Sequence, residues 1–402
     1  MRIIKRPFYL DKLWKWKDRS IIKVLTGVRR AGKSTLLRLY REHLIASGIE
    51  DVQILALNFE NPDFGSIRNA DDLWAYVKPR LAHGRMTYVF LDEIQRVDGF
   101  EKAVDGLFVQ ENVDIYLTGS NAYLLSGEIA TYLSGRYVTL HVHPLSFREY
   151  CEGLGFMGNP ERAWTDYLRF GSFPQVASLG NDPELVSAFN EGLYNTILQK
   201  DVTARCRTAS SPAFDRIVAF LFDNIGNLSS VRSIAAGLAS EGVKIAANTI
   251  DEYLDRLCEA YLFYKVRAID VQGREHLKTG CKYYVADIGL RQYLLGSRTF
   301  DRGHVLENVV YLELLRRHRE VFIGRNGTRE IDFIARDGAD ITYYQIAETL
   351  SSEEVRDREF APLQAIRDHH PKVVLTLDPM PPANDNGIRT FNALDFLIGT
   401  AP

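Results

Sequence analysis

The chain of 402 residues is too long for one compact core, so its length predicts two or three domains. Hydrophobic residues make up 46% and charged residues 25% of the chain, which is ordinary for a soluble globular protein. The formal net charge of −3 excludes a general electrostatic attraction to nucleic acid, so any such contact requires a local basic patch. No apolar run approaches the roughly 18 residues that a membrane-spanning helix needs.

The N-terminal stretch MRIIKRPFYLDKLWKWK (1–17) is charged throughout and lacks the apolar core of a signal peptide. Its aromatic and basic residues leave a membrane-surface helix open, but we favour a packing arm that leads into the first strand. The cysteines lie far apart and the histidines are scattered. This pattern predicts neither a disulfide framework nor a zinc site, and it fits a reducing cytoplasm.

Short apolar runs alternate with helical patterns from residue 21 to residue 146. The runs are IIKVLTG (21–27), ILALNFE (54–60), YVFLDE (88–93), DIYLTGS (114–120) and YVTLHV (137–142). Near-continuous apolar strands separated by helices indicate a parallel sheet with helices on both faces. This part of the chain is therefore predicted to have an α/β fold.

The stretch GVRRAGKST (27–35) fits the pattern G-x-x-x-x-G-K-[ST] at every fixed position and lies between a predicted strand and a predicted helix. Gly27 and Gly32 permit the backbone angles that turn the loop N–H groups inward, and the helix beginning near Lys33 adds the positive end of its dipole. We favour a phosphate-binding loop over an ordinary turn. The residues predicted to bind nucleotide are Gly27, Val28, Arg29, Arg30, Ala31, Gly32, Lys33, Ser34 and Thr35.

The chemistry of such a loop assigns further roles. We expect Lys33 to reach the β- and γ-phosphates and Ser34 to offer its hydroxyl to Mg²⁺. The strand YVFLDE ends in two carboxylates, of which Asp92 is predicted to complete the metal shell and Glu93 to orient and polarise the attacking water. Acids also end strands for solubility, but the loop upstream favours the catalytic interpretation. Lys33 and Glu93 are therefore predicted catalytic residues.

Polar residues near two other strands are further candidates. Ser120 and Asn121 follow the fourth strand, where they would either sense the γ-phosphate or cap the next helix. Arg136 precedes the fifth strand and would either stabilise charge on a neighbouring subunit's γ-phosphate or form a surface salt bridge. The catalytic alternative for Arg136 requires a homo-oligomer, which the sequence does not decide.

The ordered motifs resemble those of the prokaryotic AAA-type ATP-binding proteins that carry a C-terminal domain of unknown function. The motifs are TGVRRAGKSTLL, NFE, VFLDEIQ, LTGSNAYLLS, LSGRY, PLSFREY, GSFPQV, KYYVADIGLR, LEN and REIDF. The resemblance implies an AAA-like P-loop core, a winged-helix segment and a C-terminal domain related to the restriction-endonuclease-like fold. It also implies ATP as the nucleotide, and the sequence contains no guanine-reading N-K-x-D motif.

The predicted organisation has four parts, with a P-loop AAA-type domain at 1–150 and a helical lid or linker at 151–210. Residues 211–295 read as three helices and two strand-like runs, an order typical of a winged helix. Residues 296–402 are predicted to form the restriction-endonuclease-like α/β domain. Within that domain, two strands are expected to join at Asp337–Gly338, a dipeptide that favours hairpin turns.

A nuclease of the restriction-endonuclease type needs a carboxylate on one strand and an acid-x-Lys motif on the next. Asp332 fills the first position, and Glu307 on the preceding helix is an additional candidate ligand. The second motif reads Gln345-Ile346-Ala347 instead. An amide is a poor Mg²⁺ anchor and an alanine polarises nothing, so we expect this domain to lack nuclease activity.

The expected recognition helix of the winged-helix segment has one arginine, Arg256, against four acids, which are Asp251, Glu252, Asp255 and Glu259. Since phosphate contacts supply most of the affinity for nucleic acid, this face favours packing or protein docking over DNA binding. A separate basic stripe would change that conclusion. Its candidate members are Arg232, Lys244, Arg267 and Lys282.

The sequence thus predicts a cytoplasmic, Mg²⁺-dependent ATPase that uses hydrolysis to drive or switch its C-terminal domains. Two alternatives stay open: a nucleotide-controlled adaptor with little turnover, and an ATPase that binds or processes DNA. A protein partner is expected at the C-terminal domains, and no membrane contact is expected.

Overall fold

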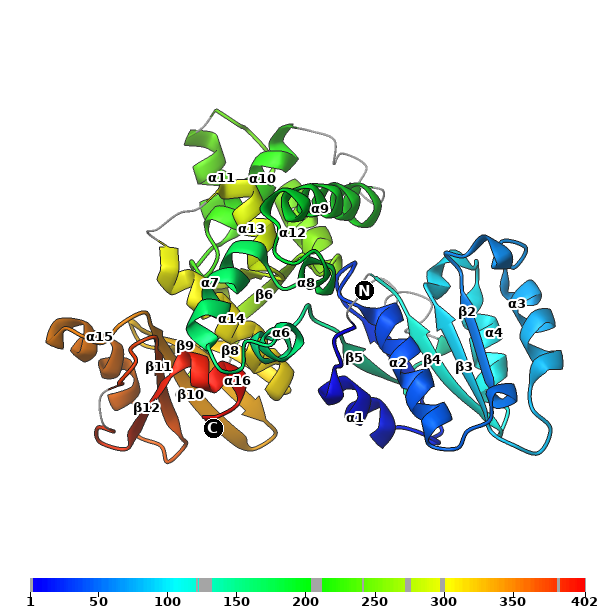
Figure 1. Cartoon of the computed structure of the whole chain (residues 1–402). Coiled ribbons are helices and arrows are strands. Elements are labelled where there is room, and N and C mark those ends of the chain that lie inside the picture. The colour runs from blue at the N-terminus through cyan, green and yellow to red at the C-terminus, as the bar shows by residue number, and fades with distance from the viewer. Residues whose placement is uncertain are drawn as a thin grey trace. The chain divides into compact units, whose positions relative to one another are not determined.

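The chain folds into two compact units, which are described in a computed structural model (Figure 1). The first unit comprises Met1–Pro144 with Glu259–Tyr261, and the second comprises Leu145–Cys258 with Leu262–Pro402. The residues that the structure describes are 3–120, 122, 132–203, 212–240, 242–271, 276–296, 301–381 and 384–401.

A parallel sheet forms the centre of the first unit. Its strands are β1 (Ile22–Thr26), β2 (Ile54–Asn58), β3 (Thr87–Asp92), β4 (Val113–Thr118) and β5 (Tyr137–His141). They lie in the order β2-β3-β4-β1-β5, and each neighbouring pair is parallel. β1 and β3 are buried along their whole length, as expected for apolar strands covered on both faces. The predicted parallel α/β core is confirmed.

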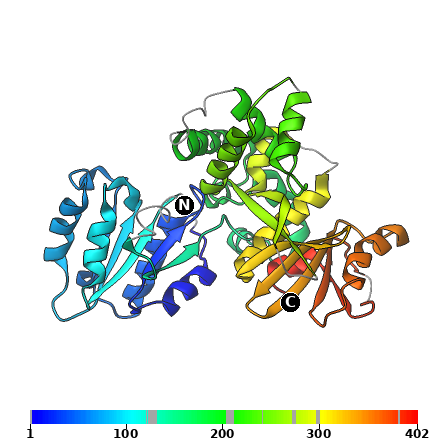
Figure 2. The same ribbon diagram turned by 180° about the vertical axis from the view of Figure 1, so that it is seen from behind.

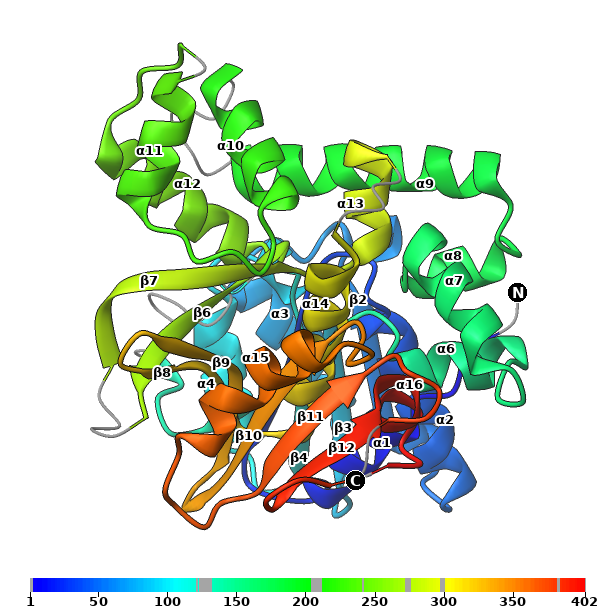
Figure 3. The same ribbon diagram turned by 90° about the vertical axis from the view of Figure 1, so that its left-hand side faces the viewer.

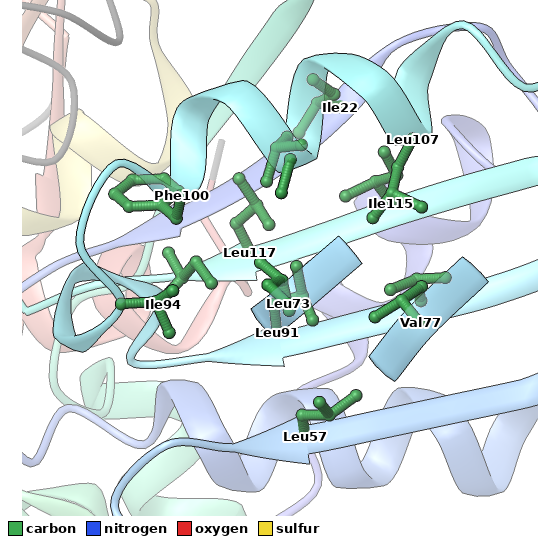
Figure 4. Close-up of a cluster of buried hydrophobic side chains, with 14 of the residues drawn as sticks. Ile22, Leu57, Leu73, Val77, Leu91, Ile94, Phe100, Leu107, Ile115 and Leu117 are labelled. Carbon is green, nitrogen blue, oxygen red and sulfur yellow. The ribbon is translucent and has the colours of Figure 1, made fainter. Parts of the chain in front are cut away.

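Helices cover both faces of this sheet (Figures 1 and 2). They are α1 (Pro7–Lys15), α2 (Lys33–Ala46), α3 (Ala70–Val77) and α4 (Phe100–Phe108), with short 3-10 turns η1 (Asp51–Gln53), η2 (Pro62–Phe64), η3 (Lys78–Arg80) and η4 (Ile94–Arg96). Successive strand residues point to opposite faces. Leu91 packs in a buried cluster with residues of α3 and α4 (Figure 4), whereas the ring of Phe90 lies 6.4 Å from that of Tyr40 on α2. Therefore α2 covers the face opposite to α3 and α4.

A mixed sheet organises the second unit. Its strands are β6 (Phe263–Asp270), β7 (His276–Val285), β8 (Glu320–Asn326), β9 (Arg329–Asp337), β10 (Asp340–Ala347), β11 (Lys372–Thr376) and β12 (Ile388–Asn392). Their order is β12-β11-β10-β9-β8-β6-β7. β9 and β10 form the hairpin predicted at Asp337–Gly338, and Gly338 has a φ of 69° that suits such a turn.

Helices precede this sheet in the chain and also cover it. They are α6 (Phe147–Leu154), α7 (Pro160–Phe170), α8 (Pro174–Ser178), α9 (Pro183–Thr196), α10 (Pro212–Asp223), α11 (Val231–Ser240), α12 (Ala247–Glu259), α13 (Ile288–Leu295), α14 (Arg302–Arg317), α15 (Glu353–Gln364) and α16 (Ala393–Ile398), with a π-helical turn η6 (Ile197–Val202). Figure 3 shows α15 against the strands β9 and β10. Among the described helices, none has the length and apolarity needed to cross a bilayer.

The helices α10 to α12 are followed by the β6–β7 hairpin, which is the element order expected for residues 211–295. However, β6 also pairs with β8 in parallel, so the hairpin belongs to the same sheet as the strands of 296–402. Sequence patterns reveal strands but not their non-local partners, and for this reason the shared sheet was not expected. The domain boundary between residues 295 and 296 stays a prediction, and strands from both sides of that boundary form one sheet.

Two motifs that are distant in sequence, GSFPQV and KYYVADIGLR, meet inside the second unit. The carboxylate of buried Asp287 accepts hydrogen bonds from the Ser172 backbone N–H at 2.6 Å and its hydroxyl at 2.7 Å. A Cβ added to Gly171 would lie 2.5 Å from Asp287 Oδ1, and one added to Gly289 would lie 2.4 Å from the Phe170 carbonyl oxygen. The two glycines thus allow a close approach of these segments.

Candidate nucleotide-binding site

The loop between β1 and α2 has the backbone shape of an anion nest. Gly27, Arg30 and Gly32 have positive φ values of 137°, 66° and 98°. A Cβ at Gly27 would lie 2.1 Å from the Val142 carbonyl oxygen, so this position has no room for a side chain. Left-handed residues between right-handed ones turn successive N–H groups to one side. The left-handed conformation of Arg30 was not predicted, because a non-glycine residue gives no such signal.

Lys33 is the first residue of α2 and is buried. Its Nζ donates to the Gly27 carbonyl oxygen at 2.8 Å and to the Val28 carbonyl oxygen at 3.1 Å. No acidic residue lies in the first turn of α2, and no side chain caps this described terminus. The helix dipole and the ammonium group therefore present positive charge at the same loop.

The carboxylate of Asp92 collects polar groups from three neighbouring elements. Asp92 ends β3, and its Oδ1 accepts a hydrogen bond from Ser34 Oγ at 3.0 Å. Its Oδ2 accepts from Asn58 Nδ2 at 2.9 Å, and Thr118 Oγ1 donates to Oδ1 as well. Burial raises the pKa of Asp92, while the Thr118 and Ser34 hydrogen bonds oppose that rise. The structure thus brings Ser34 and Asp92 together, as the predicted metal site requires.

Asn58 and Thr118 belong to the motifs NFE and LTGSNAYLLS, but neither was predicted to be a site residue. Both are the last residues of their strands, β2 and β4, which flank β3 in the sheet. Because carboxyl ends of parallel strands meet at one edge, polar residues at these positions converge with Asp92. A search for polar strand-terminal residues would have found them.

Glu93 follows Asp92 in an unusual backbone conformation, with φ 56° and ψ 45°. Its N–H donates to Thr118 Oγ1 at 2.9 Å, and its Oε2 accepts from Gln95 Nε2 at 2.5 Å. Burial raises the pKa of Glu93, and the charge of Lys33 opposes that rise. A left-handed non-glycine residue costs roughly 1–3 kcal/mol and persists where its surroundings fix it. Here the hydrogen bond from the Glu93 N–H to Thr118 Oγ1 helps to fix that conformation.

The remaining predicted residues lie in different places. Ser120 is buried just after β4, and Asn121 lies outside the described residues. The Arg136 carbonyl oxygen accepts a hydrogen bond from the N–H of Ile22, the first residue of β1. Arg136 therefore lies at the amino end of the parallel strands, whereas the phosphate loop follows their carboxyl end. Its side chain is 42% exposed and forms an ion pair with Asp105 on α4. Within one chain Arg136 is therefore remote from Lys33.

The second unit contains a buried ion cluster, which we call the Lys282 cluster and which comprises Lys282, Glu307, Glu330 and Asp332. Lys282 Nζ lies 2.7 Å from Glu307 Oε1, 2.8 Å from Glu330 Oε1 and 4.0 Å from Asp332 Oδ1. The lysine side chain is only 4% exposed. Lys282 therefore takes no part in an exposed basic stripe, and its inclusion among the candidates for one was wrong. Lys282 lies on β7, which pairs with β6 as expected, but the pairing of β6 with β8, which joins this hairpin to the large sheet, was not visible in the sequence.

The acidic residues of this cluster border a hollow of about 790 Å³. Gln345 Nε2 donates to Glu359 Oε2 at 2.9 Å, and the Ile346 N–H donates to Asp332 Oδ2 at 2.8 Å. Burial and the nearby Glu307 charge raise the pKa of Asp332 well above its ordinary value. Among the described residues, no group of three or more His, Cys, Asp or Glu side chains is arranged to hold a metal ion. Lys282 supplies the positive charge in this cluster, and the absence of nuclease activity stays a prediction.

Comparison with known proteins decides the family. Two family models match the chain. An AAA domain matches residues 19–151, and a domain of unknown function, DUF8612, matches residues 161–301. An uncharacterized protein of Haemophilus influenzae is 36% identical over 400 residues, covering 98% of this chain and 99% of the relative. The chain belongs to this family of AAA-domain proteins. The expected AAA domain, followed by a domain of unknown function, is confirmed.

The AAA-domain protein has similar proteins in archaea too. An uncharacterized protein of Methanocaldococcus jannaschii is 28% identical over 369 residues, covering 86% of this chain and 79% of the relative. The solved structure of a Walker-type ATPase of Pyrococcus abyssi has a TM-score of 0.51 and 17% identity, covering 73% of this chain and 96% of that one. This likeness supports the P-loop fold. The winged-helix and restriction-endonuclease-like assignments stay predictions.

Proposed function

We propose that this AAA-domain protein is a Mg²⁺-dependent ATPase. The observation that carries the proposal is the 3.0 Å contact between Ser34 Oγ and Asp92 Oδ1, because it joins the phosphate loop to the strand that ends in Glu93. The AAA domain match and the fold likeness to a Walker-type ATPase support ATP as the substrate. The carboxyl end of one parallel sheet thus carries the anion nest of the loop, the Lys33 ammonium group, the Ser34 hydroxyl and the carboxylates of Asp92 and Glu93.

In this proposal the loop N–H groups and Lys33 bind the triphosphate. The Lys33 ammonium now donates to two carbonyls of its own loop, at 2.8 and 3.1 Å. Phosphate oxygens carry more negative charge than carbonyls and form stronger hydrogen bonds with an ammonium group. Lys33 is therefore poised to exchange at least one carbonyl for a phosphate oxygen when ATP enters.

The residues beside the loop fit Mg²⁺. This ion prefers oxygen ligands and is commonly held by one or two carboxylates together with substrate phosphates. Ser34 offers an exposed hydroxyl, and Asp92 offers a carboxylate whose position is fixed by Asn58 and Thr118. When bound, Mg²⁺ supplies positive charge to the β- and γ-phosphate oxygens. Ser34 and Asp92 would hold it.

Glu93 would orient the attacking water and accept its proton. Hydrolysis forms a bond from the water oxygen to the γ-phosphorus, and the bond from that phosphorus to the bridging oxygen breaks, leaving the electron pair on ADP. The raised pKa of Glu93 makes its carboxylate a stronger base than an exposed one. Thr118 fixes its backbone through the 2.9 Å hydrogen bond, so the base is held in place before substrate arrives.

Hydrolysis in the first unit would drive or switch the second unit, which is the proposed site of protein partners. DNA binding is less favoured, because α12 exposes Asp251, Glu252 and Asp255 and Lys282 is buried. The adaptor alternative predicts ATP binding with little turnover. Arg136 would act only in a homo-oligomer, where it would extend from the amino end of the strands in one subunit to the γ-phosphate bound by a neighbouring subunit.

Release of phosphate from ATP, measured with and without Mg²⁺, tests the proposed function. We expect turnover by the wild type, loss of turnover with retained ATP binding in Glu93→Gln, and weakened binding in Lys33→Ala. An adaptor would bind ATP but release little phosphate in the wild type and in Glu93→Gln alike. Lys102→Ala, an exposed lysine on α4, is the matched control and should behave as wild type.

A further inference from the structure

Gln95 forms a hydrogen bond with the carboxylate of Glu93, the proposed general base. It lies in η4, the short turn directly after Glu93, and its Nε2 donates to Glu93 Oε2 at 2.5 Å. The other end of the same amide, Oε1, is buried and has no hydrogen-bond partner among the described residues. A buried acceptor without a partner costs roughly 1–3 kcal/mol. An amide in this state is a candidate for binding a donor during function.

The orientation of this amide follows from chemistry. An ionised carboxylate only accepts hydrogen bonds, so the NH₂ end of Gln95 must face Glu93 and the carbonyl end must face away from it. Since both ends belong to one planar group, Oε1 lies within a few ångströms of the Glu93 carboxylate. The acceptor therefore stands next to the proposed base and not at a distant site.

The position of Gln95 is also fixed by its neighbours. Ile94 on one side is fully buried in the core beneath α3 and α4 (Figure 4), and the Arg96 N–H donates to the Glu93 carbonyl oxygen at 3.2 Å. Glu93 itself is held by Thr118 in its left-handed conformation. The backbone on both sides of Gln95 is thus anchored, which is what a positioning residue requires.

We propose that Gln95 is a positioning residue for ATP hydrolysis. Its N–H holds one oxygen of the Glu93 carboxylate, and its carbonyl accepts a hydrogen bond from the attacking water. One hydrogen of the water points to Glu93 and the other points to Gln95 Oε1. Glu93 takes its proton as the water oxygen bonds to the γ-phosphorus. Fixing both hydrogens aims the oxygen lone pair. This inference rests on the proposed ATPase function.

A purely structural role for Gln95 makes different predictions. If the amide only packed against Glu93, its loss would lower stability and disturb substrate binding without a specific effect on the chemical step. A positioning role instead lowers kcat while KM and ATP affinity stay near the wild-type values. It also makes the effect depend on Glu93, because Gln95 acts partly through that carboxylate.

The test uses the full chain and the variant Gln95→Leu, which keeps the bulk of the side chain and removes both polar ends. We expect kcat to fall roughly tenfold to a hundredfold with little change in KM. Binding of ADP with aluminium fluoride, which mimics the transferring phosphoryl group, should weaken while ATP affinity is kept. Gln110→Leu, a partly buried glutamine in the same unit, is the matched control and should match the wild type in both measurements.

A double-mutant cycle completes the test. In Glu93→Gln the base is already lost, so adding Gln95→Leu should slow hydrolysis little further. Wild-type kcat in Gln95→Leu, or a loss that adds in full to that of Glu93→Gln, would overturn the role of Gln95 while the ATPase proposal stands. A wild type that binds ATP but releases no phosphate would overturn both proposals.

Discussion

Ser34 in the first turn of α2 donates a hydrogen bond to Asp92 at the end of β3, over 3.0 Å. This contact couples the phosphate loop to the carboxylate edge of the sheet. It also gives the loop and the proposed metal ligand a fixed relationship before any nucleotide binds.

Replacing Ser34 by alanine should weaken ATP binding about tenfold in the presence of Mg²⁺ and have little effect without it, because the hydroxyl is proposed to contact the ion. Titration of ATP in both conditions measures the difference. Ser47→Ala is the matched control, since this hydroxyl donates to the Leu44 carbonyl oxygen at the other end of α2. An equal loss of affinity with and without Mg²⁺ would argue against a metal role for Ser34.

Thr118 bridges the two carboxylate residues, donating to Asp92 and accepting from the Glu93 N–H. Thr118→Val keeps the shape but leaves a buried N–H unpaired, so the free energy of unfolding should fall by roughly 1–3 kcal/mol. Turnover should fall as well, because Glu93 loses its anchor. Thr118→Ser keeps the hydroxyl and should restore turnover. Chemical denaturation and phosphate release measure the two effects, and a fully active valine variant would contradict the bridging role.

Arg136 offers a test of oligomeric action. If it reaches a neighbouring subunit's γ-phosphate, Arg136→Ala and Glu93→Gln should each be inactive, yet a mixture should regain activity. In the mixture, one copy supplies an intact Glu93 and the other supplies the arginine. If Arg136 only pairs with Asp105, mixing should restore nothing, and Asp105→Ala should change stability as Arg136→Ala does.

Removing Lys282 should destabilise the second unit strongly. Lys282→Met leaves three acidic neighbours without their buried positive charge, and breaking such a pairing costs about 3–5 kcal/mol. Lys265→Met is the matched control, because Lys265 Nζ lies 3.9 Å from Oδ1 of exposed Asp255, and a surface pair of this kind is expected to contribute under about 1 kcal/mol. Denaturant titration measures both losses.

The cost of Lys282→Met should also depend on pH. Burial tends to raise the pKa of Glu307, but the charge of Lys282 and the hydrogen bonds from Lys282, His304 and Tyr284 together outweigh burial, so the folded pKa is lowered. In the wild type this carboxylate therefore contributes stability above its unfolded pKa, and the contribution is lost as pH falls through the lowered folded value. Without Lys282 the carboxylates protonate more readily, so the difference between variant and wild type should shrink at acid pH. A difference that stays constant would contradict the pairing.

Local patterns were enough to predict the parallel core and the placement of the loop residues. Gly27 and Lys33 lie in one contiguous motif, and Asp92 ends an uninterrupted apolar run, so neither required knowledge of distant pairings. Asn58 and Thr118 contact Asp92 only because β2 and β4 flank β3 in the sheet. The periodicity of hydrophobic residues along the chain does not specify the order of strands. For the same reason Lys282 was named as a candidate for an exposed basic stripe, because the pairing of β6 with β8 could not be foreseen.

The most direct test of the central claim is binding of labelled ATP to the purified full chain, measured together with phosphate release. The account predicts binding in the presence of Mg²⁺ that falls about tenfold or more in Lys33→Ala, because a charged hydrogen bond contributes about 1.5–3 kcal/mol. It also predicts turnover that is lost in Glu93→Gln. Equal ATP binding by the wild type and Lys33→Ala would contradict it.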